Sequence, residues 1–445
     1  MPRVWPLRPS DLAAIAGANV LLIVGMWVRH GGLGHLADLP SQLTSLGELS
    51  ALLGTYAALV QVVLMARTPW LDQLFGMDRL ANWHRWLGFG TLWLLVGHGI
   101  LTTIGYAMVD GLSIPGEAWS LVTTYPFVLM ATVGLGLFML VGVTSLRLAR
   151  RSISYETWYF VHLYAYLAII LSFAHALVVG ADFMDDPIAR LYWIALYGLA
   201  AASVIAFRLG APIRLSLRHR LRVANVAHEA PGVVSVYLTG LHLDRLAVRS
   251  GQFFIWRFLA GDGWWRAHPF SLSAAPNGTY LRITIKDVGD YTSALQHLRR
   301  GTPVFIEGPY GAFTGARRTK SKVLLVAGGI GITPVRALLE DLPAPRGGLT
   351  LLYRARTAKD FVFRDEIDAL LQQRGGVAHY LVGKRGASDA PADPFDPRSI
   401  LRLIPDVRDR EIYVCGPGGL TESVRRSLRT LQVPAAQIHW ERFAY

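Results

Sequence analysis

The sequence predicts a multidomain membrane protein with a six-helix α transmembrane bundle over residues 1–212, an antiparallel β-barrel domain over residues 213–316 and an α/β domain over residues 317–445. Three observations support this prediction. The first part holds six apolar runs, each long enough to cross a bilayer core of about 30 Å. A basic, proline-started segment over residues 211–222 is expected as a linker, and the second part then has short alternating strands between Gly, Pro and Asn-Gly turns. The third part changes to strand–loop–helix units.

The apolar runs and the charges between them predict how the chain crosses the membrane. The runs lie near residues 11–29, 43–66, 84–108, 121–145, 156–179 and 188–209. The loops 30–42, 109–120 and 180–188 contain no Lys or Arg. The other side carries the arginines, which are Arg3, Arg8, Arg67, Arg79, Arg147, Arg150, Arg151, Arg208, Arg214, Arg218, Arg220 and Arg222. Because cytoplasmic loops are rich in Lys and Arg, both termini and the domains after residue 212 are expected in the cytoplasm.

Composition narrows the classes of function. A mean hydropathy of +0.34 is too apolar for a soluble enzyme of this length. The net charge of +13 fits this topology and contact with anionic lipid, and the sequence contains no nucleic-acid-binding motif. The single cysteine, Cys415, excludes an intrachain disulfide and a cysteine-ligated cluster.

Four histidines stand out inside the third and fifth runs. His84 and His98 lie fourteen residues apart, and His162 and His175 lie thirteen apart. At 1.5 Å per residue, each pair is separated by about 20 Å along its helix. The topology places His84 with His162 near the inner face and His98 with His175 near the outer face, which suits two haems with one axial ligand from each helix. Packing histidines are the alternative, and zinc or copper would need further ligands at each level.

Other polar or small residues of the membrane half have two interpretations each. Four glycines could let a porphyrin approach the backbone or could serve helix packing, namely Gly88, Gly90, Gly97 and Gly99. Three arginines could meet haem propionates or lipid headgroups, namely Arg67, Arg79 and Arg85. Three acidic residues of an outer loop could attract a cation or could be solvated, namely Asp182, Asp185 and Asp186.

The segment 266–276, RAHPFSLSAAP, has the features of a flavin-binding element. In His268-Pro269-Phe270-Ser271, an aromatic ring could lie on the isoalloxazine ring, and the next hydroxyl could reach a ring nitrogen. A basic group nearby could meet the phosphates. The alternative is an ordinary strand that ends in a proline turn.

Two glycine-containing segments predict anion-binding helix starts. In KDVGDYTSALQHL, Gly289, Tyr291 and Thr292 lie where backbone N–H groups could bind a pyrophosphate, although a capped surface helix would have the same pattern. In KVLLVAGGIGITPVRALLEDL, a buried strand is followed by a glycine loop and a helix. The residues expected to face a dinucleotide there are Gly328, Gly329, Gly331, Thr333 and Pro334.

The strand GLTLLYRART ends in Arg354 and Arg356. An acidic residue at this place would favour NADH through the ribose hydroxyls, whereas arginine suits a 2′-phosphate. The sequence therefore predicts a preference for NADPH, with NADH possible.

These segments resemble the ferric reductase and NADPH oxidase family over residues from about 45 to 445. HPFSLSAAP is similar to the flavin motif of that family, and the histidine spacings match those of its two b-type haems. The family also has a Gly-Asp-aromatic-Thr segment and a segment like IEGPYGAF, whose glycines here are Gly308 and Gly311. GGIGITP is similar to the nicotinamide loop of the ferredoxin-reductase superfamily.

The resemblance also implies roles near the hydride path. A Cys-Gly-Pro segment lies beside the nicotinamide in the family, which here gives Cys415 and Gly416, although a small buried residue is the simpler interpretation of Cys415. Family members end in an aromatic residue that covers the flavin, and Phe443 fits that place better than Tyr445. Together with Ser271, Phe443 and Cys415 are the residues expected closest to hydride transfer.

The implied function is a membrane oxidoreductase that passes electrons from cytoplasmic NAD(P)H through FAD and two b-type haems to an acceptor on the outer side. That acceptor could be ferric iron or its chelate, oxygen, or a periplasmic redox partner. Family oxidases carry a further histidine one turn beyond the outer ligand, where this chain has Thr102. A transporter or haem sensor with a regulatory nucleotide domain is the alternative from a different class.

Overall fold

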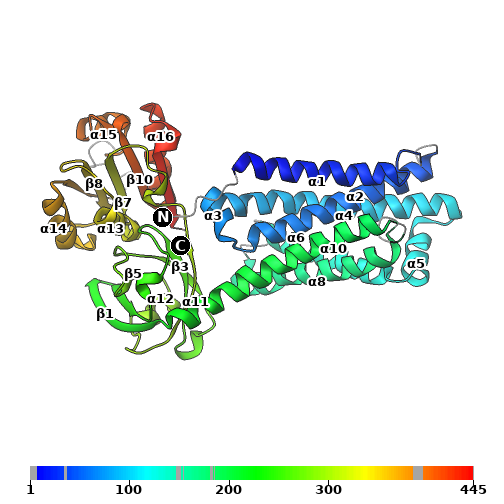
Figure 1. The fold of residues 1–445 in the computed structure, drawn as a ribbon, viewed down its shortest axis with the longest axis horizontal. Helices are drawn as coiled ribbons and strands as arrows, with labels where there is room; N and C mark the ends of the chain where they lie inside the picture. The colour runs from blue at the N-terminus through cyan, green and yellow to red at the C-terminus, as the bar shows by residue number, and fades with distance from the viewer. Residues whose placement is uncertain are drawn as a thin grey trace. The chain divides into compact units, whose positions relative to one another are not determined.

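The computed structural model describes residues 8–34, 38–146, 152–153, 155–180, 184, 186–383 and 394–443. It divides into two compact units, Met1–Leu209 and Gly210–Tyr445, which are called the membrane unit and the second unit below. Figure 1 shows the helical membrane unit in blue to green and the mixed second unit in green to red.

The membrane unit is entirely helical in the part that the structure describes. Its elements are α1 (Pro9–Arg29), α2 (Leu39–Met65), α3 (Pro69–Phe75), α4 (Met77–Asp110), α5 (Ile114–Thr124), α6 (Val128–Ser145), α8 (Tyr155–Val179), α10 (Pro187–Ser203) and the π-helical turn η2 (Val204–Gly210). Among the described residues, six helices are long and apolar enough to cross a membrane, as predicted.

Glycines let α2 and α4 approach closely. A Cβ atom on Gly47 would lie 2.7 Å from the Thr102 side chain, and one on Gly105 would lie 2.6 Å from Thr44. Small residues of this kind are what permit close helix packing in a membrane. The approach brings the backbone of α2 against α4, the helix that carries His84 and His98.

Polar groups fix two helix starts. The carboxylate of Asp38 accepts a hydrogen bond from the Ser41 N–H and caps α2. Asp186 caps α10 by accepting from the N–H groups of Ile188 and Ala189. Asp186 also pairs with Arg29 and His30 at 3.1 Å, so this acidic residue ties the end of α1 to the start of α10. Asp182 and Asp185 lie outside the described residues.

Two helix boundaries differ from the prediction. The apolar run 121–145 is interrupted, because α5 ends at Thr124 and α6 begins at Val128. Tyr125 precedes Pro126 and takes an extended conformation, as steric contact with a following proline requires. The basic segment 211–222, expected as a linker, forms α11 (Ala211–His219), whose Pro212 lies in the first turn, where a missing N–H costs little.

After α11, the second unit begins with six antiparallel strands, called the two-sheet part. One sheet has the order β1 (Arg222–Ala230), β2 (Val233–Thr239), β5 (Leu281–Lys286), and the other has the order β4 (His268–Ser271), β3 (Phe253–Phe258), β6 (Val304–Tyr310). The strands form two small sheets, and their pairing does not show the closed antiparallel barrel that was predicted. Isolated bridges between Arg222 and Pro303 and between Leu272 and Ile283, with neighbouring backbone hydrogen bonds, connect residues of the two sheets.

The remainder of the second unit, called the parallel-sheet part, confirms the predicted α/β pattern. Its five strands have the order β11 (Ile438–Phe443), β10 (Arg410–Pro417), β7 (Lys322–Gly328), β8 (Leu349–Ala355) and β9 (Val377–Val382). The accompanying helices are α13 (Ile332–Asp341), α14 (Arg364–Arg374), α15 (Pro397–Leu403) and α16 (Gly418–Thr430). The chain runs from β7 outward to β9 and returns to β10 on the other side of β7. Ligands of open α/β sheets bind at the carboxyl ends of strands at such a reversal.

Candidate functional site

The inner pair of predicted haem ligands meets in the structure. The ring centroids of His84 on α4 and His162 on α8 lie 5.8 Å apart, with 63° between the ring planes. Two imidazoles that share one metal ion, each nitrogen about 2 Å from it, place their ring centres about 6 Å apart. The Nδ1 atom of His162 is buried and has no hydrogen-bond partner among the described residues. The donor set and spacing would therefore suit two histidine ligands of one metal centre.

The outer pair lies on the same two helices. The Nδ1 atom of His98 lies 3.0 Å from the carbonyl oxygen of Gly47 on α2. Because a carbonyl only accepts, Nδ1 carries the proton and Nε2 is left with a lone pair, the state that a metal ligand requires. His175 on α8 is the second histidine of this level, and its Nδ1 atom is buried.

The glycines around these histidines fall into two groups. A Cβ atom on Gly88 would lie 3.2 Å from Gln61, and one on Gly99 would lie 3.6 Å from Leu135, so these two fit helix packing. At Gly90 and Gly97 an added Cβ would meet no atom within 4 Å. Only this second pair leaves open the space that a large planar group would use.

For the basic residues near the inner end of the membrane unit, both interpretations, propionate binding and headgroup contact, stay open. Arg85 donates to the side chain of Asn82 at 2.6 Å, and Arg67 has a backbone φ of 63° where α2 has just ended. Neither observation distinguishes propionate binding from headgroup contact.

The predicted flavin motif forms β4 and pairs with β3. Phe270 lies opposite Phe254, His268 lies opposite Trp256, and the Trp256 Nε1 atom donates to the Phe270 carbonyl at 2.8 Å. This pairing holds Pro269 at an exposed position and buries Ser271, which lies opposite Phe253. The alternation leaves successive residues of the motif facing opposite sides of the sheet.

Tyr291 of α12 (Asp290–Leu295) joins this motif. Its ring stacks on the imidazole of His268 with centroids 4.1 Å apart, and its hydroxyl donates to the Arg266 carbonyl at 3.4 Å. Burial raises the pKa of the Tyr291 hydroxyl to about 12, so this group stays a neutral donor. The Arg266 Nε atom is buried and has no hydrogen-bond partner among the described residues. Arg266 is thus the basic group of the motif with an unused donor.

The start of α12 is held by its own side chains. The Thr292 hydroxyl donates to the Gly289 carbonyl at 2.8 Å and accepts from the Val288 N–H at 2.9 Å. Asp287 accepts from the Ser293 hydroxyl at 2.6 Å, and this bond, with further ones from Gly289 and Thr292, lowers the pKa of Asp287. These contacts are those of a capped turn, so a pyrophosphate role for Gly289 and Thr292 stays a prediction.

The two glycines of IEGPYGAF approach the aromatic residues of β3. Gly308 has φ of 136° and Gly311 has φ of 98°, a region in which a side chain would be strained. A Cβ atom would lie 3.0 Å from Phe254 at Gly308 and 3.2 Å from Phe253 at Gly311. The close approach predicted for these glycines is to protein side chains.

The glycine loop after β7 lies against the end of β10. A Cβ atom on Gly331 would lie 2.4 Å from the Cys415 carbonyl oxygen, and Gly416 touches Gly328. At Gly329 the φ is +53° and an added Cβ would meet no atom within 4 Å. The two segments therefore share one edge of the sheet, at the reversal of strand order, with Gly329 facing open space.

The helix that follows this loop is buried at its start. Thr333 donates its hydroxyl to the Ile330 carbonyl at 3.0 Å, and Pro334 is also buried in the first turn of α13. Cys415 is fully buried, and burial raises the pKa of its thiol well above the ordinary value. A protonated, enclosed thiol is a poor nucleophile, in agreement with the interpretation of Cys415 as a small packing residue.

The remaining predicted residues lie at the same edge of the sheet. Arg354 pairs in register with Gly328, and its guanidinium lies 5.8 Å from the centre of the Phe395 ring, whereas Arg356 is exposed just beyond β8. Phe443 is the last residue of β11, lies opposite Pro417 and packs against the apolar cluster that contains Cys415. Tyr445 lies outside the described residues.

Comparison with known families agrees with this geometry. Residues 50–173 match the family described as the ferric reductase like transmembrane component, residues 221–314 match an FAD-binding domain, and residues 325–426 match an oxidoreductase NAD-binding domain. The chain belongs to the ferric reductase and NADPH oxidase family. Its described residues contain six helices long and apolar enough to cross a membrane, followed by an FAD-binding domain and an oxidoreductase NAD-binding domain.

Curated relatives match part of this chain. The ferredoxin reductase component of a 3-ketosteroid-9-alpha-monooxygenase from Mycobacterium tuberculosis is 31% identical over 207 residues, which cover 45% of this chain and 56% of that protein. A flavohemoprotein of Chromobacterium violaceum is 30% identical over 293 residues, which cover 60% of this chain and 72% of that protein. The chain spans little more than half of the length of the first of these relatives.

Among solved structures, the flavohem-like FAD/NAD binding domain of nitric oxide dioxygenase from Vibrio cholerae is similar to this chain. It is 26% identical, covers 50% of this chain and 98% of its own length, and superposes with a TM-score of 0.40.

Two features of the second unit were not found from the sequence. Arg266 begins the motif RAHPFSLSAAP. Its position just before the strand that carries Pro269 and Phe270 could have identified it as the basic group of the flavin site. No pattern in the sequence indicates the second feature, a cluster of Arg282, Arg336, Glu340 and Glu366, because its members lie up to 84 residues apart.

Proposed function

We propose that this chain transfers electrons from cytoplasmic NADPH, through FAD and two b-type haems, across the membrane to an acceptor on the outer side. The single observation that carries this proposal is the His84–His162 pair, 5.8 Å apart on two helices that also carry His98 and His175. One matched pair in a membrane helix bundle could be a packing feature, but a second on the same helices points to a chain of two redox centres.

The proposed ligand sets are His84 with His162 for the inner haem and His98 with His175 for the outer haem. When bound, FAD accepts a two-electron hydride and releases single electrons, and haem iron carries one electron at a time. The Gly47 carbonyl orients the His98 ring by accepting a hydrogen bond from its Nδ1–H group. The topology with both termini and the second unit in the cytoplasm rests on the distribution of arginines between the helices.

In the second unit we propose that β4 and α12 hold FAD, with Tyr291, Arg266 and Ser271 as the main side chains. The loop at Gly329 and the start of α13 would hold the nicotinamide nucleotide, with Phe443 and Cys415 beside it. The proposed domain boundaries are 1–212, 213–316 and 317–445, and the three family matches lie inside them.

The experiment that tests the proposal is a haem and turnover measurement on the purified full-length protein. A pyridine haemochrome assay should give about two b-type haems per chain, and NADPH should reduce both in a reduced-minus-oxidised spectrum. One haem or none in the intact protein would contradict the ligand sets. A transporter or sensor would show no NADPH-driven haem reduction.

Among acceptors, ferric iron or its chelate is favoured over oxygen. The place one turn after His98 is taken by Thr102, whose hydroxyl donates to the His98 carbonyl at 2.7 Å and whose methyl group faces Gly47. The Thr102 side chain is thus engaged in contacts within α4 and with α2. It carries no ionisable group that could act beside the outer histidines. NADPH-driven turnover with ferric chelate, oxygen or a redox protein as acceptor would identify the favoured one.

A further inference from the structure

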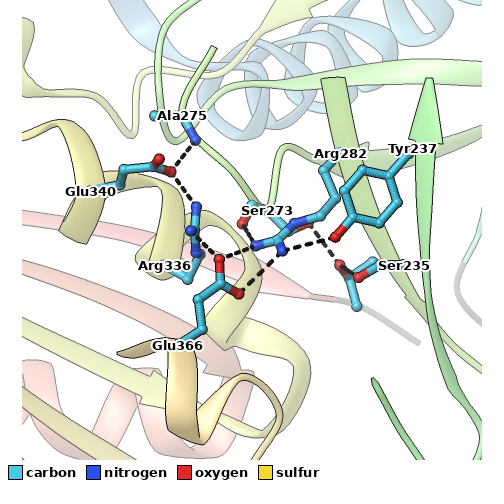
Figure 2. A network of polar contacts seen from close by, with 9 residues as sticks. Ser235, Tyr237, Ser273, Ala275, Arg282, Arg336, Glu340 and Glu366 are labelled. Atoms are coloured by element: carbon cyan, nitrogen blue, oxygen red, sulfur yellow. Dashed lines mark hydrogen bonds and ion pairs between the residues drawn. The ribbon is translucent and has the colours of Figure 1, made fainter. Parts of the chain in front are cut away.

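A buried ionic network joins the two parts of the second unit (Figure 2). It consists of Arg282 on β5, Arg336 and Glu340 on α13, and Glu366 on α14. Both arginine side chains are 6% exposed, and the two glutamates are about one-third exposed. The set holds two positive and two negative charges, so it is neutral only when both parts contribute.

Arg282 is the member from the two-sheet part. Its guanidinium donates to both oxygens of Glu366, at 3.1 and 3.2 Å, in a bidentate pair. It also donates to the Ser273 carbonyl at 2.7 Å, and it lies 4.5 Å from the centre of the Phe363 ring. Bidentate pairing fixes orientation as well as distance.

Arg336 is the member from the parallel-sheet part. Its guanidinium donates to Glu366 and to Glu340. Glu340 in turn accepts from the Ala275 N–H at 2.8 Å, which is a backbone group of the two-sheet part. The two parts are therefore linked twice, through Glu366 and through Glu340, as Figure 2 shows.

The ends of the network lie next to the two proposed cofactor segments. Ser273 and Ala275 directly follow β4, which carries the flavin motif 268–271. Arg336 lies in the second turn after the glycine loop 329–331. The network thus connects the flavin strand to the nicotinamide loop without either arginine belonging to those segments.

We infer that Glu366 is a positioning residue for hydride transfer, because its carboxylate holds the flavin-bearing and nicotinamide-bearing segments at a fixed separation. Hydride transfer requires close alignment of donor and acceptor, and a misplacement of about 1 Å far from the chemistry costs about a hundredfold in rate. Separation of the two parts would leave Arg282 without its counter-charge and the parallel-sheet part with two carboxylates for one arginine, which disfavours other arrangements. The inference rests on the proposed transfer from nicotinamide nucleotide to FAD.

The test is stopped-flow reduction of FAD by NADPH in the full-length protein and in Glu366→Gln. The variant keeps the size of the side chain and removes its charge. The reduction rate should fall by tenfold to about a hundredfold. The dissociation constant for NADPH should change little, and the charge-transfer band between reduced flavin and NADP⁺ should weaken. Asp368→Asn is the matched control, because Asp368 is a half-exposed carboxylate on the same helix that pairs with Arg364 and Tyr380 only within the parallel-sheet part.

A merely structural role would give a different result. Glu366→Gln would then lower FAD retention or thermal stability, while the flavin-loaded fraction reduced at the unmodified rate with an unchanged charge-transfer band; that result overturns the inference. If Glu366→Gln does not fold, Arg282→Lys and Arg336→Lys, which keep the charge but lose the planar fork, are judged by the same rate and band. Failure of NADPH and NADH to reduce the flavin of the unmodified protein would instead refute the proposed function, and the positioning role with it.

Discussion

The membrane unit and the second unit place their functional residues in different ways. In the membrane unit, four histidines lie on two helices at nearly equal spacings, so each level is determined by helical rise alone. In the second unit, Gly331 meets Cys415 and Arg282 meets Glu366, although 84 residues separate each of these pairs. The comparison shows that helix periodicity suffices to build the first site, whereas the second depends on sheet order and packing.

The packing of the two units differs for the same reason. The largest buried apolar cluster of the membrane unit has few fully buried members, which are Ile23, Met26, Ala189 and Trp193. The second unit has three larger cores on the faces of its sheets. Lipid-facing helices leave apolar side chains exposed, whereas a water-soluble domain must enclose them. Substitutions should therefore act locally in the membrane unit and more widely in the second unit.

The largest effect should come from removing an outer histidine. His98→Ala should lower the haem content from about two to about one per chain, because the outer haem would lose one of its two proposed ligands, and it should abolish transfer to the outer acceptor. Flavin reduction by NADPH should persist. Pyridine haemochrome and stopped-flow assays measure both.

The matched control is His30→Gln, a histidine of the same unit that pairs with Asp186 and belongs to neither level. Loss of both haems in His98→Ala would show that the two levels do not form independently. Helical rise alone would then not determine each level, and the contrast between the units would be wrong.

The second-largest effect should be a change in the preference for NADPH over NADH. Arg356→Ala should raise the KM for NADPH by about tenfold or more and leave the KM for NADH nearly unchanged, because a charge-assisted pair contributes about 1.5–3 kcal/mol. Arg356 is favoured over Arg354 because it is exposed at the sheet edge, whereas Arg354 lies near the Phe395 ring. Steady-state kinetics with both nucleotides checks this, with Arg354→Ala as the control; equal use of NADPH and NADH by the unmodified protein would remove the basis for it.

A pair of glycine substitutions compares packing in the two units directly. Gly331→Ala should reduce the free energy of unfolding of the second unit by about 1–3 kcal/mol, because its Cβ would lie 2.4 Å from the Cys415 carbonyl. Gly90→Ala should change the stability of the membrane unit by less than about 0.5 kcal/mol, since no atom lies within 4 Å. Thermal unfolding followed by flavin fluorescence and by haem absorbance reports each unit separately.

A loss of haem in Gly90→Ala, with little change in helix stability, would indicate that the missing side chain makes room for the macrocycle. Equal and small effects of the two substitutions would show that the second unit tolerates backbone shifts as readily as the membrane unit.

The smallest expected effect concerns Phe443. If this ring covers the flavin and must move aside for nicotinamide, Phe443→Ala should strengthen the charge-transfer band and slow nucleotide release a few-fold. Phe443→Trp should keep stacking and slow hydride transfer. Stopped-flow flavin reduction on both variants measures this, with Tyr445→Ala as the control.

If Phe443 only packs the last strand onto the cluster that contains Cys415, Phe443→Ala should instead lower flavin retention with no change in the band. Unchanged rates in both Phe443 variants with a changed rate in Tyr445→Ala would transfer the role to Tyr445.

The six long apolar helices, the α/β pattern and the family could be predicted from the sequence, because apolar length, strand–loop–helix order and short motifs are local properties. The break at Tyr125 was missed, since an apolar run continues through it although Pro126 forces the chain out of the helix. The helix over 211–219 was missed because Pro212 and the basic residues suggested a linker.

The contacts between distant residues could not be predicted in this way. The folded chain brings His162 to His84, the Gly47 carbonyl to His98, and Cys415 to the glycine loop. It also lets Arg282 and Arg336 share Glu366. These contacts depend on which helices and strands are neighbours, and that choice is made by packing and charge pairing over the whole unit, which no local pattern of the sequence records.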